Sequence, residues 1–433
     1  MSFPSAADLE GLVPSSDLPP LARVRYDPPQ PVVEDRDAAV EYTLDQLIGG
    51  VDPGSTIAIG VGSRGIDRID QLTAQVVDIL ENRGFDPYIV PAMGSHGGGT
   101  ASGQRAVLEG LGITPSSVNC PIEASMETTT IGTADIVTTT VEVPFSTAAL
   151  SADLVLPINR IAPHTSFNGR IESGIAKMLV VGFGKREGAR LLHRLGRTYG
   201  FVDTIEAILP VVFDVVSTGG GMGIVENGDK RVADVTPIPR DGLLTIEAEV
   251  LRRARDLLPT YPFDTIDLLV VDTMGKDISG TGMDPNVIGR PGTGGSVPPG
   301  ASSVERIYVR SLSPGSKGNA NGIGLADIVN SDVYDAMDPQ ATYANVLTSG
   351  YPEKAAIPMV MPTDELAIHA LVESLGARSR DDLRIAWIGH TGGLSRFRAS
   401  EALLRRIDDP DIHIEEWLEV EFVEGELVGS AIS

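Results

Sequence analysis

The stretch Thr56-Ile-Ala-Ile-Gly60 decides the fold of the first half of this chain. It is a short apolar run with a glycine-rich loop after it, which is typical of a buried strand. Helical apolar spacing follows over 67–82, Pro87-Tyr-Ile-Val-Pro91 predicts a second strand, and another helix is expected near 103–111. Strand and helix alternate here at the spacing of a βαβ unit, so we predict a parallel sheet.

The same alternation continues along the chain. Ala152–Asn159 predicts a further strand, and Ile266–Asp272 starts a second α/β region. Because 433 residues exceed one ordinary core, two domains are expected. We predict an α/β protein with an N-terminal parallel-sheet domain over 1–262 and a smaller C-terminal α/β domain over 263–433. The prolines of the first 30 residues favour an extended arm over the surface.

The composition excludes several classes of partner. Acidic side chains outnumber basic ones by 59 to 34, and the net charge of −25 repels nucleic acid and anionic membranes. This acidity, with only six lysines, is typical of a high-salt cytoplasm, where ions screen self-repulsion; an ordinary acidic protein is the alternative. No membrane-length apolar run and no secretion signal is present, so we expect a cytoplasmic protein. The single Cys120 excludes a thiolate metal cluster.

Lysine and histidine, rare elsewhere, gather in the window Asn159–Gly196. Lys177 interrupts an apolar run, where it either extends to the surface or is held inside for covalent chemistry, because desolvation lowers the pKa of an amine. His193 follows two leucines on a predicted helix and suits either a helix C-terminus or a metal. We interpret Lys185 as a partner of Glu187.

Three polar residues follow predicted strands. Arg64 comes after the first strand, His96 lies in a glycine loop after the second, and His164 follows the third. Because ligands of parallel sheets bind beyond the carboxyl ends of the strands, we expect these side chains at one edge. Two imidazoles there suit acid–base chemistry near neutral pH, and surface histidines are the alternative.

Gly60-Val-Gly-Ser-Arg-Gly65 fits the glycine pattern of a dinucleotide-binding loop. The full pattern also includes an acidic residue at the end of the second strand, and Val90-Pro-Ala-Met93 contains none. The competing interpretation is a glycine loop that aims the Arg64 guanidinium at an anionic group of a substrate. An NAD-linked oxidoreductase is thus one alternative function.

Taken together, Gly62-Ser-Arg64, Gly94-Ser-His96-Gly, His164, Lys177 and His193 resemble the nickel-dependent lactate racemase family in order and spacing, over most of the chain. The resemblance implies a nickel pincer nucleotide attached through Lys177, with His193 as the nickel ligand. It also implies that His96 and His164 form the acid–base pair, that Arg64 binds the substrate carboxylate, and that the site lies between the two domains. The reaction would invert a 2-hydroxyacid by reversible hydride transfer.

Two departures from the lactate enzymes concern the substrate. Apolar Val61 stands near the position of an acidic residue, and Met283–Arg290 replaces a segment that leads to a substrate-binding lysine. Lys276 and Arg290 are candidates for the missing positive charge, with Lys317 as a third. The expected substrate is a small 2-hydroxyacid, either lactate or a larger, more polar one such as a sugar acid. A non-catalytic nickel- or cofactor-binding protein is the further alternative.

Overall fold

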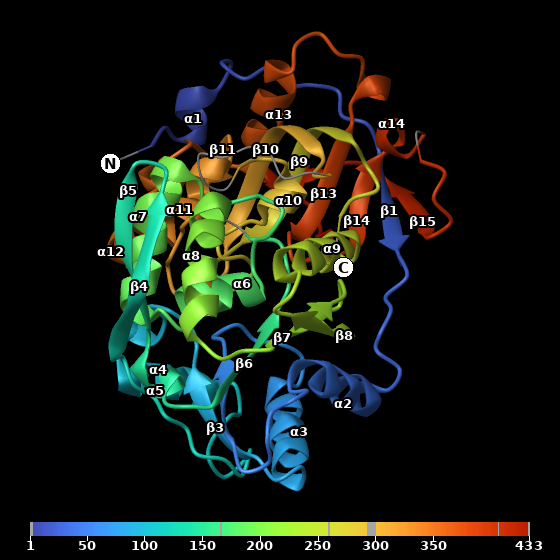
Figure 1. Cartoon of the computed structure of the whole chain (residues 1–433). Coiled ribbons are helices and arrows are strands. Elements are labelled where there is room, and N and C mark those ends of the chain that lie inside the picture. Colours follow the sequence, from blue (N-terminus) through green and yellow to red (C-terminus); the bar gives the residue numbers. More distant parts are fainter. Residues whose placement is uncertain (1–2, 165–166, 259, 292–299, 406, 432–433) are drawn as a thin grey trace. The chain divides into compact units, whose positions relative to one another are not determined.

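The computed structural model describes the whole chain except residues 1–2, 165–166, 259, 292–299, 406 and 432–433 (Figure 1). The chain divides into two compact units. The five-stranded unit consists of Gln30–His164 and Asn168–Leu258, and the eight-stranded unit of Met1–Pro29, Thr165–Phe167 and Pro259–Ser433. The first 29 residues therefore group with the C-terminal part of the chain, whereas the sequence analysis assigned them to a domain over 1–262.

The sheet of the five-stranded unit has the strand order β3-β2-β6-β7-β8. Its first four strands are parallel, and β8 pairs with β7 in the antiparallel direction. The predicted α/β class and the parallel βαβ arrangement are confirmed. The strands are β2 (Thr56–Val61), β3 (Asp86–Pro91), β6 (Leu154–Arg160), β7 (Gly220–Glu226) and β8 (Val232–Pro239).

Both faces of this sheet are covered. In β2, Ile57 and Ile59 belong to one apolar cluster with α2 and α3, whereas Ala58 belongs to a second cluster with α7, α8 and α9. Successive strand residues point to opposite faces, which is why this strand is apolar throughout. The covering elements are α2 (Arg36–Leu47), α3 (Ile69–Asn82), α4 (Ala101–Gly110), the hairpin β4 (Thr128–Ile136) and β5 (Thr139–Ser146), α5 (Thr147–Leu150), α7 (Lys185–Tyr199), α8 (Phe201–Val215) and α9 (Leu243–Asp256).

The second sheet has the strand order β12-β11-β10-β9-β13-β14-β1-β15. The first five strands are parallel, and β14, β1 and β15 add antiparallel pairs. Leu21 in β1 pairs with Ser400 on one side and Leu418 on the other, so the expectation of an N-terminal surface arm is wrong for residues 21–26. The strands are β1 (Leu21–Tyr26), β9 (Thr265–Met274), β10 (Ser303–Leu312), β11 (Ile328–Asn330), β12 (Met359–Met361), β13 (Ile385–His390), β14 (Gly393–Ser400) and β15 (Ile412–Leu418).

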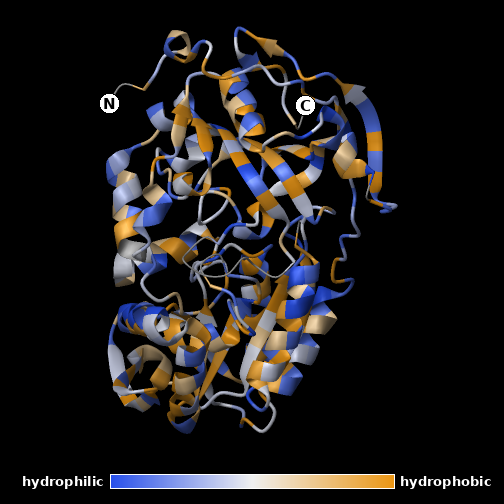
Figure 2. Ribbon diagram, turned by 90° about the horizontal axis from the view of Figure 1, so that it is seen from above, coloured by the Kyte–Doolittle hydropathy of each residue, from blue (hydrophilic) through white to orange (hydrophobic). Residues whose placement is uncertain are grey.

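Helices also cover this larger sheet. Along β9, Leu269 and Val271 join one apolar cluster, while Leu268 and Val270 join another that includes α13. Figure 2 shows hydrophilic and hydrophobic residues alternating along the helices, as expected for helices with one face on a sheet. The remaining elements are α1 (Ala6–Leu9), α10 (Pro285–Ile288), α11 (Ser331–Asp335), α12 (Pro339–Ser349), α13 (Asp364–Ser374), α14 (Glu401–Leu404), β16 (Phe422–Val423) and β17 (Glu426–Leu427). Within the described ranges, no helix is both long and apolar enough to cross a bilayer.

Candidate functional site

The carboxyl ends of β2, β3 and β6 lie at one edge of the five-stranded sheet. Arg64 follows β2, His96 follows β3 and His164 follows β6, as the sequence predicts. The Ser63 hydroxyl and His96 Nδ1 share a hydrogen bond, so the first two loops are in contact. The structure therefore places Arg64 and His96 on touching loops.

The Arg64 guanidinium has no ion-pair partner among the residues that the structure describes. Surrounding protein atoms, and then the charge of Arg160, lower the pKa of Arg64 although its side chain still reaches solvent. Arg160 itself forms an ion pair with Glu226. Arg64 thus stands at the sheet edge as a guanidinium whose charge the described residues leave uncompensated.

The loop that carries His96 is held by two buried side chains. Gln104 of α4 donates from Nε2 to the carbonyl oxygens of Gly94, at 2.8 Å, and of His96, at 3.4 Å. Lys185 Nζ donates to the carbonyl oxygen of Pro91 at 2.6 Å and to Gln104 Oε1 at 3.3 Å. These contacts connect the end of β3 with α4 and fix the backbone on both sides of the loop.

Lys185 therefore has an internal role. It is fully buried, and burial lowers the pKa of its amine to about 8. Its interpretation as a partner of Glu187 is wrong, because Glu187 instead lies near Arg186 and Arg190 on the exposed face of α7. Sequence spacing alone could not separate these possibilities, since Lys185 precedes the first regular turn of the helix with φ at 54°.

A buried carboxylate shapes the loop that carries His164. Glu172 is 1 % exposed and accepts the backbone N–H of His164. It also accepts the N–H of Gly169 at 3.0 Å and a guanidinium N–H of Arg255 at 2.6 Å. The sequence analysis did not assign a role to Glu172 or to its partner on α9. Thr165, the residue after His164, lies outside the described residues.

Lys177 ends the short helix α6 (Ile175–Lys177) and leads into the π-helical turn η2 (Met178–Gly182). The N–H of Phe183 closes this wide turn on the carbonyl oxygen of Met178 at 2.9 Å. At the other end, Glu247 of α9 accepts the N–H of Ala176 at 2.9 Å. Glu247 is fully buried, and burial raises the pKa of its carboxyl to about 7. Such π-turns are frequent at functional sites.

Electrostatic interactions group the lysine with other candidate residues. Burial and then the charge of Arg64 lower the pKa of the half-buried Lys177 amine to about 7, and Glu172 opposes this shift. The pKa of the His193 imidazole on α7 is lowered by surrounding protein atoms and by Lys177. Its ring meets Phe201 edge-on, with 6.3 Å between the ring centres. Arg64, Lys177 and His193 therefore belong to one cluster.

The three remaining candidates belong to the eight-stranded unit, and one of them, Lys317, is exposed. Lys276, half-buried after β9, donates from Nζ to the carbonyl oxygen of Gly280 at 2.7 Å. Arg290 forms an ion pair with Asp327 and donates to the carbonyl oxygen of Leu325 at 2.7 Å. The contacts of Arg290 favour a structural role within its own unit.

The glycines of the Gly60–Gly65 loop have a packing explanation. A Cβ on Gly60 would collide with the ring of Phe183, and one on Gly62 would lie 3.3 Å from Asn159 Oδ1. Helix α3 begins only at Ile69, so the glycine turn does not run directly into a helix as a dinucleotide loop does. These observations argue against the NAD-binding interpretation.

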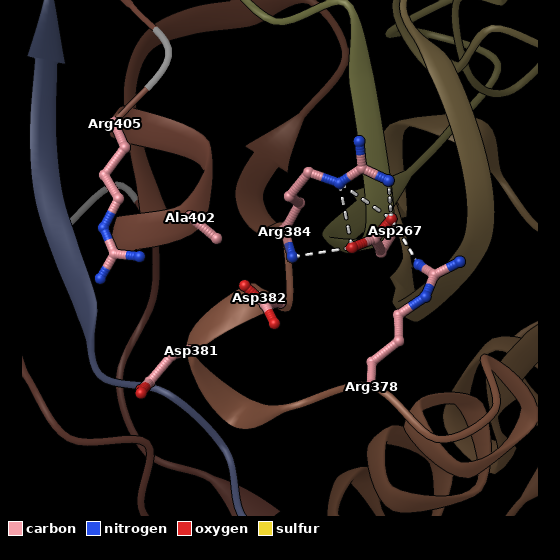
Figure 3. Close-up of a pocket in the computed structure, with 7 residues that line it drawn as sticks. All are labelled: Asp267, Arg378, Asp381, Asp382, Arg384, Ala402 and Arg405. Carbon is pink, nitrogen blue, oxygen red and sulfur yellow. Dashed lines mark hydrogen bonds and ion pairs between the residues drawn. The ribbon is translucent and has the colours of Figure 1, made fainter.

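A cavity of about 500 Å³ lies near the amino ends of β9 and β13 (Figure 3). Arg378 and Arg384 both point at Asp267, and Arg384 Nε lies 3.0 Å from its Oδ1. Arg405 pairs with Glu401 at 3.0 Å. The three arginines that line this cavity are thus all paired with carboxylates, and ligands of α/β sheets bind at the opposite edge. We assign it a structural role.

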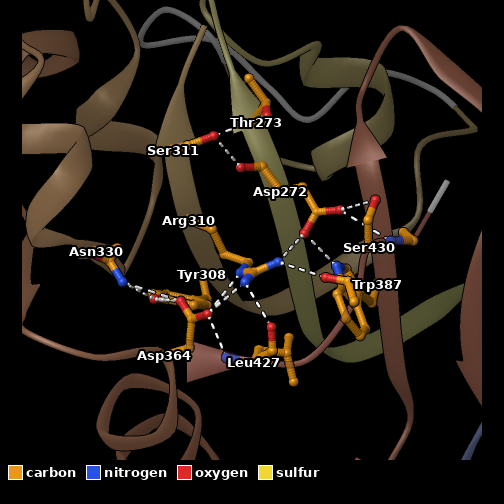
Figure 4. Close-up of polar contacts among 12 residues, drawn as sticks. Asp272, Thr273, Tyr308, Arg310, Ser311, Asn330, Asp364, Trp387, Leu427 and Ser430 are labelled. Atoms are coloured by element: carbon orange, nitrogen blue, oxygen red, sulfur yellow. Dashed lines mark hydrogen bonds and ion pairs between the residues drawn. The ribbon is translucent and has the colours of Figure 1, made fainter. Parts of the chain in front are cut away.

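A smaller cavity of about 300 Å³ adjoins a polar network on β9 and β10 (Figure 4). Arg310 bridges two carboxylates, Asp272 at 2.8 Å and Asp364 at 2.7 Å. The Tyr308 hydroxyl donates to Asp364 and Trp387 Nε1 donates to Asp272, both at 2.6 Å. Because these groups satisfy one another, the network stabilises the larger sheet without calling for a ligand.

The described part of the chain contains no group of three or more His, Cys, Asp or Glu side chains placed to hold a metal ion. A metal bound near His193 would therefore need further donors from a cofactor. Cys120 is not such a donor, because it is buried and burial raises the pKa of its thiol to about 12. No protein-family model and no curated protein matches the chain.

Proposed function

We propose that the five-stranded unit carries the active site of an enzyme that racemises or epimerises a small 2-hydroxyacid. The observation that carries this proposal is the uncompensated guanidinium of Arg64, placed beside the loop of His96. Lys177 adds a second cationic group nearby. The Arg64 guanidinium, which has no ion-pair partner among the described residues, favours an anionic ligand, and a guanidinium binds a carboxylate through two parallel hydrogen bonds.

In this proposal the histidines move the proton of the substrate hydroxyl. Direct removal of the proton on C2 is unfavourable, because the carboxylate beside it stabilises a carbanion poorly. His96 is held at Nδ1 by Ser63, so the proton is exchanged at Nε2. His164, on the loop fixed by Glu172, serves the opposite face of the substrate. One base on each face allows inversion in either direction.

The nickel pincer nucleotide implied by the family resemblance supplies, when bound, a reversible acceptor for the hydrogen on C2. Lys177 fits the attachment of this group, because an amine with a pKa of about 7 is about half neutral, and therefore nucleophilic, at neutral pH. His193 fits a metal ligand, because its lowered pKa leaves the imidazole neutral with a lone pair to donate. A single protein imidazole is sufficient where the cofactor brings its own donors.

Intact mass and metal analysis test the proposal, on protein co-expressed with the enzymes that make the cofactor. We expect one covalent adduct and one nickel per chain. Lys177→Ala should lose both, whereas Lys230→Ala, a change of an exposed lysine in the same unit, should keep both. His193→Ala should keep the adduct and lose nickel. An adduct that survives in Lys177→Ala would place the attachment elsewhere.

Turnover separates catalysis from binding alone. Loaded protein should invert at least one member of a panel of 2-hydroxyacids and sugar acids, followed by chiral chromatography. His96→Ala should keep adduct and nickel and lose turnover. Arg64→Met should raise KM more than it lowers kcat if the guanidinium binds the substrate carboxylate. Fully loaded protein that inverts no member of the panel would leave the non-catalytic, cofactor-binding alternative.

A further inference from the structure

Lysine in this chain is placed mostly away from solvent. Of the six lysines, Lys230 and Lys317 are exposed and the other four are buried or half-buried. Two of these four, Lys276 and Lys354, belong to the eight-stranded unit. An ammonium group taken out of water is costly unless an anion or several hydrogen-bond acceptors compensate it. The groups around Lys276 and Lys354 should therefore show what compensates their charges.

Lys354 is the less compensated of the two. It lies on the short helix η5 (Pro352–Ala355), and its side chain is only 3 % exposed. Its Nζ lies 5.2 Å from the centre of the Tyr351 ring, and no hydrogen-bond acceptor for it is found in the described ranges. Burial and the charge of Lys276 lower the pKa of the amine to about 8, while exposed Glu353 opposes them.

Backbone contacts bring the segments of the two lysines together. The Gly280 carbonyl oxygen accepts from Lys276 Nζ at 2.7 Å and from Asn321 Nδ2 at 3.0 Å. The next residue, Gly322, donates its N–H to the carbonyl oxygen of Lys354 at 3.0 Å. Asp277, beside Lys276 in the sequence, has its carboxylate engaged by two serine hydroxyls and thus has other partners.

Asn321 supplies a second uncompensated group. It is 2 % exposed, and its Oδ1 is buried with no hydrogen-bond partner in the part of the chain that the structure describes. A buried acceptor without a donor is destabilising. The turn beside it is fixed, since Gly282 has φ at 79° and a Cβ there would collide with the Asn321 carbonyl oxygen. The side-chain amide is held as well, because its Nδ2 donates to the carbonyl oxygen of Gly280.

We propose that Lys354, Lys276 and Asn321 form a binding site for an oxyanion that also carries an O–H group. The ammonium groups would pair with the anionic oxygens, and Asn321 Oδ1 would accept the O–H. The site follows the carboxyl end of β9, where open α/β sheets bind their ligands. A hydroxycarboxylate and hydrogen phosphate share this chemistry. The inference concerns the eight-stranded unit alone and does not rest on the proposed function.

Matched probes test both features of the ligand by calorimetric titration of the full chain at constant ionic strength. Inorganic phosphate is compared with sulfate, and malate with succinate, since the second member of each pair lacks the O–H. We expect phosphate, malate or both to bind, each about tenfold more tightly than its partner. The pair that shows the preference identifies the ligand as phosphate or hydroxycarboxylate. No binding of any probe, or equal binding within both pairs, would overturn the proposal.

Variants assign the binding to the named side chains. Lys354→Met should weaken binding at least about tenfold, whereas Lys317→Met, which removes an exposed lysine of the same unit, should not. Asn321→Leu should abolish the preference for the O–H probe. Lys354→Arg keeps the positive charge and should retain binding. This control shows whether a loss of binding in Lys354→Met comes from the lost charge or from misfolding. Equal losses in Lys354→Met and Lys317→Met would contradict the assignment.

Thermal unfolding gives an independent readout. The bound probe should raise the Tm of the wild type and not that of Lys354→Met, because a ligand stabilises only a state that binds it. Without the probe, Lys354→Met should be about as stable as the wild type, since Met keeps the apolar part of this largely buried side chain and removes its desolvated charge. Lys177→Ala, which removes the proposed cofactor attachment, should bind the probe normally, so this proposal and the proposed function can fail separately.

Discussion

The Lys177 amine should react with electrophiles near neutral pH far faster than an ordinary lysine. Its pKa is lowered from the ordinary value of 10.5 to about 7, chiefly by burial and then by Arg64. At pH 7 about half of the Lys177 amines are then neutral, against roughly 0.03 % for an amine with a pKa of 10.5. The neutral, reactive population is therefore larger by about a thousandfold.

Brief acylation at a series of pH values measures this population. The acetylated fraction of each lysine is obtained by peptide mass spectrometry, and exposed Lys317 is an internal reference in every sample. We expect Lys177 labelling to be half-maximal near pH 7. Arg64→Met should move the midpoint upward, because it removes a charge that lowers the pKa, and Glu172→Gln should move it downward for the opposite reason.

A matched control separates charge from general perturbation. Arg186→Met removes an exposed arginine of α7 and should leave the Lys177 midpoint unchanged. The reasoning is refuted if Lys177 titrates no lower than Lys317, or if Arg64→Met and Arg186→Met shift the midpoint equally. In either case the sheet edge would lack the electrostatic coupling on which the proposed attachment of the cofactor depends.

Three further substitutions test the contacts that support the candidate site and the larger sheet. The pKa of Glu247 is raised from 4.5 to about 7 in the folded protein. Between pH 4.5 and pH 7 the folded wild type therefore binds more protons than the unfolded chain, and its stability falls as the pH rises through this range. Glu247→Gln has no carboxyl at this position and lacks this loss of stability. Measured by denaturant unfolding, its stability relative to the wild type should increase by up to about 3 kcal/mol between pH 4.5 and pH 8. A stability difference between the two proteins that does not change with pH would contradict this. Lys185→Met leaves the acceptors on Pro91 and Gln104 without their donor, and hydrogen exchange at the His96 amide should accelerate; unchanged exchange would show that the lysine does not hold the loop. Arg310→Leu removes the cation that pairs with buried Asp364 and half-buried Asp272, and it should destabilise the protein by about 3–5 kcal/mol, measured by denaturant unfolding. A loss below about 1 kcal/mol would mean that the ion pairs of the network are not stabilising.

The smaller sheet could be predicted because its strands are visible locally. Thr56–Gly60 is apolar on both faces, which is the pattern of a parallel strand covered by helices on each side. The placement of Arg64 and His96 then followed from topology alone, since parallel strands present their carboxyl ends at one edge. The strand Leu21–Tyr26 was missed because it lies in a proline-rich segment and its partners are far away in the sequence.

The contacts that fix the site could not be predicted in this way. Glu172 and Arg255 are 83 residues apart, and Lys185 and Gln104 are 81 apart. The sequence around Glu172 and around Lys185 does not distinguish a buried, paired side chain from a charged residue on a solvent-exposed helix face. Only the packing of α4, α7 and α9 on the sheet brings these groups together, and tertiary packing has no local signature in the chain.

The position of β1 between β14 and the edge strand β15 of the larger sheet also has a consequence for biosynthesis. Leu21–Tyr26 leaves the ribosome early, yet its neighbours β14 and β15 are made only near the end of translation. Synthesis of the five-stranded unit ends at Leu258, so this unit can fold while both edges of β1 are still unpaired. A fragment starting at residue 260 would lack the strand between β14 and β15 and expose two open edges to aggregation. A circular permutant starting at Gln30, with residues 1–29 appended after the original C-terminus, would instead deliver β1 together with its partners.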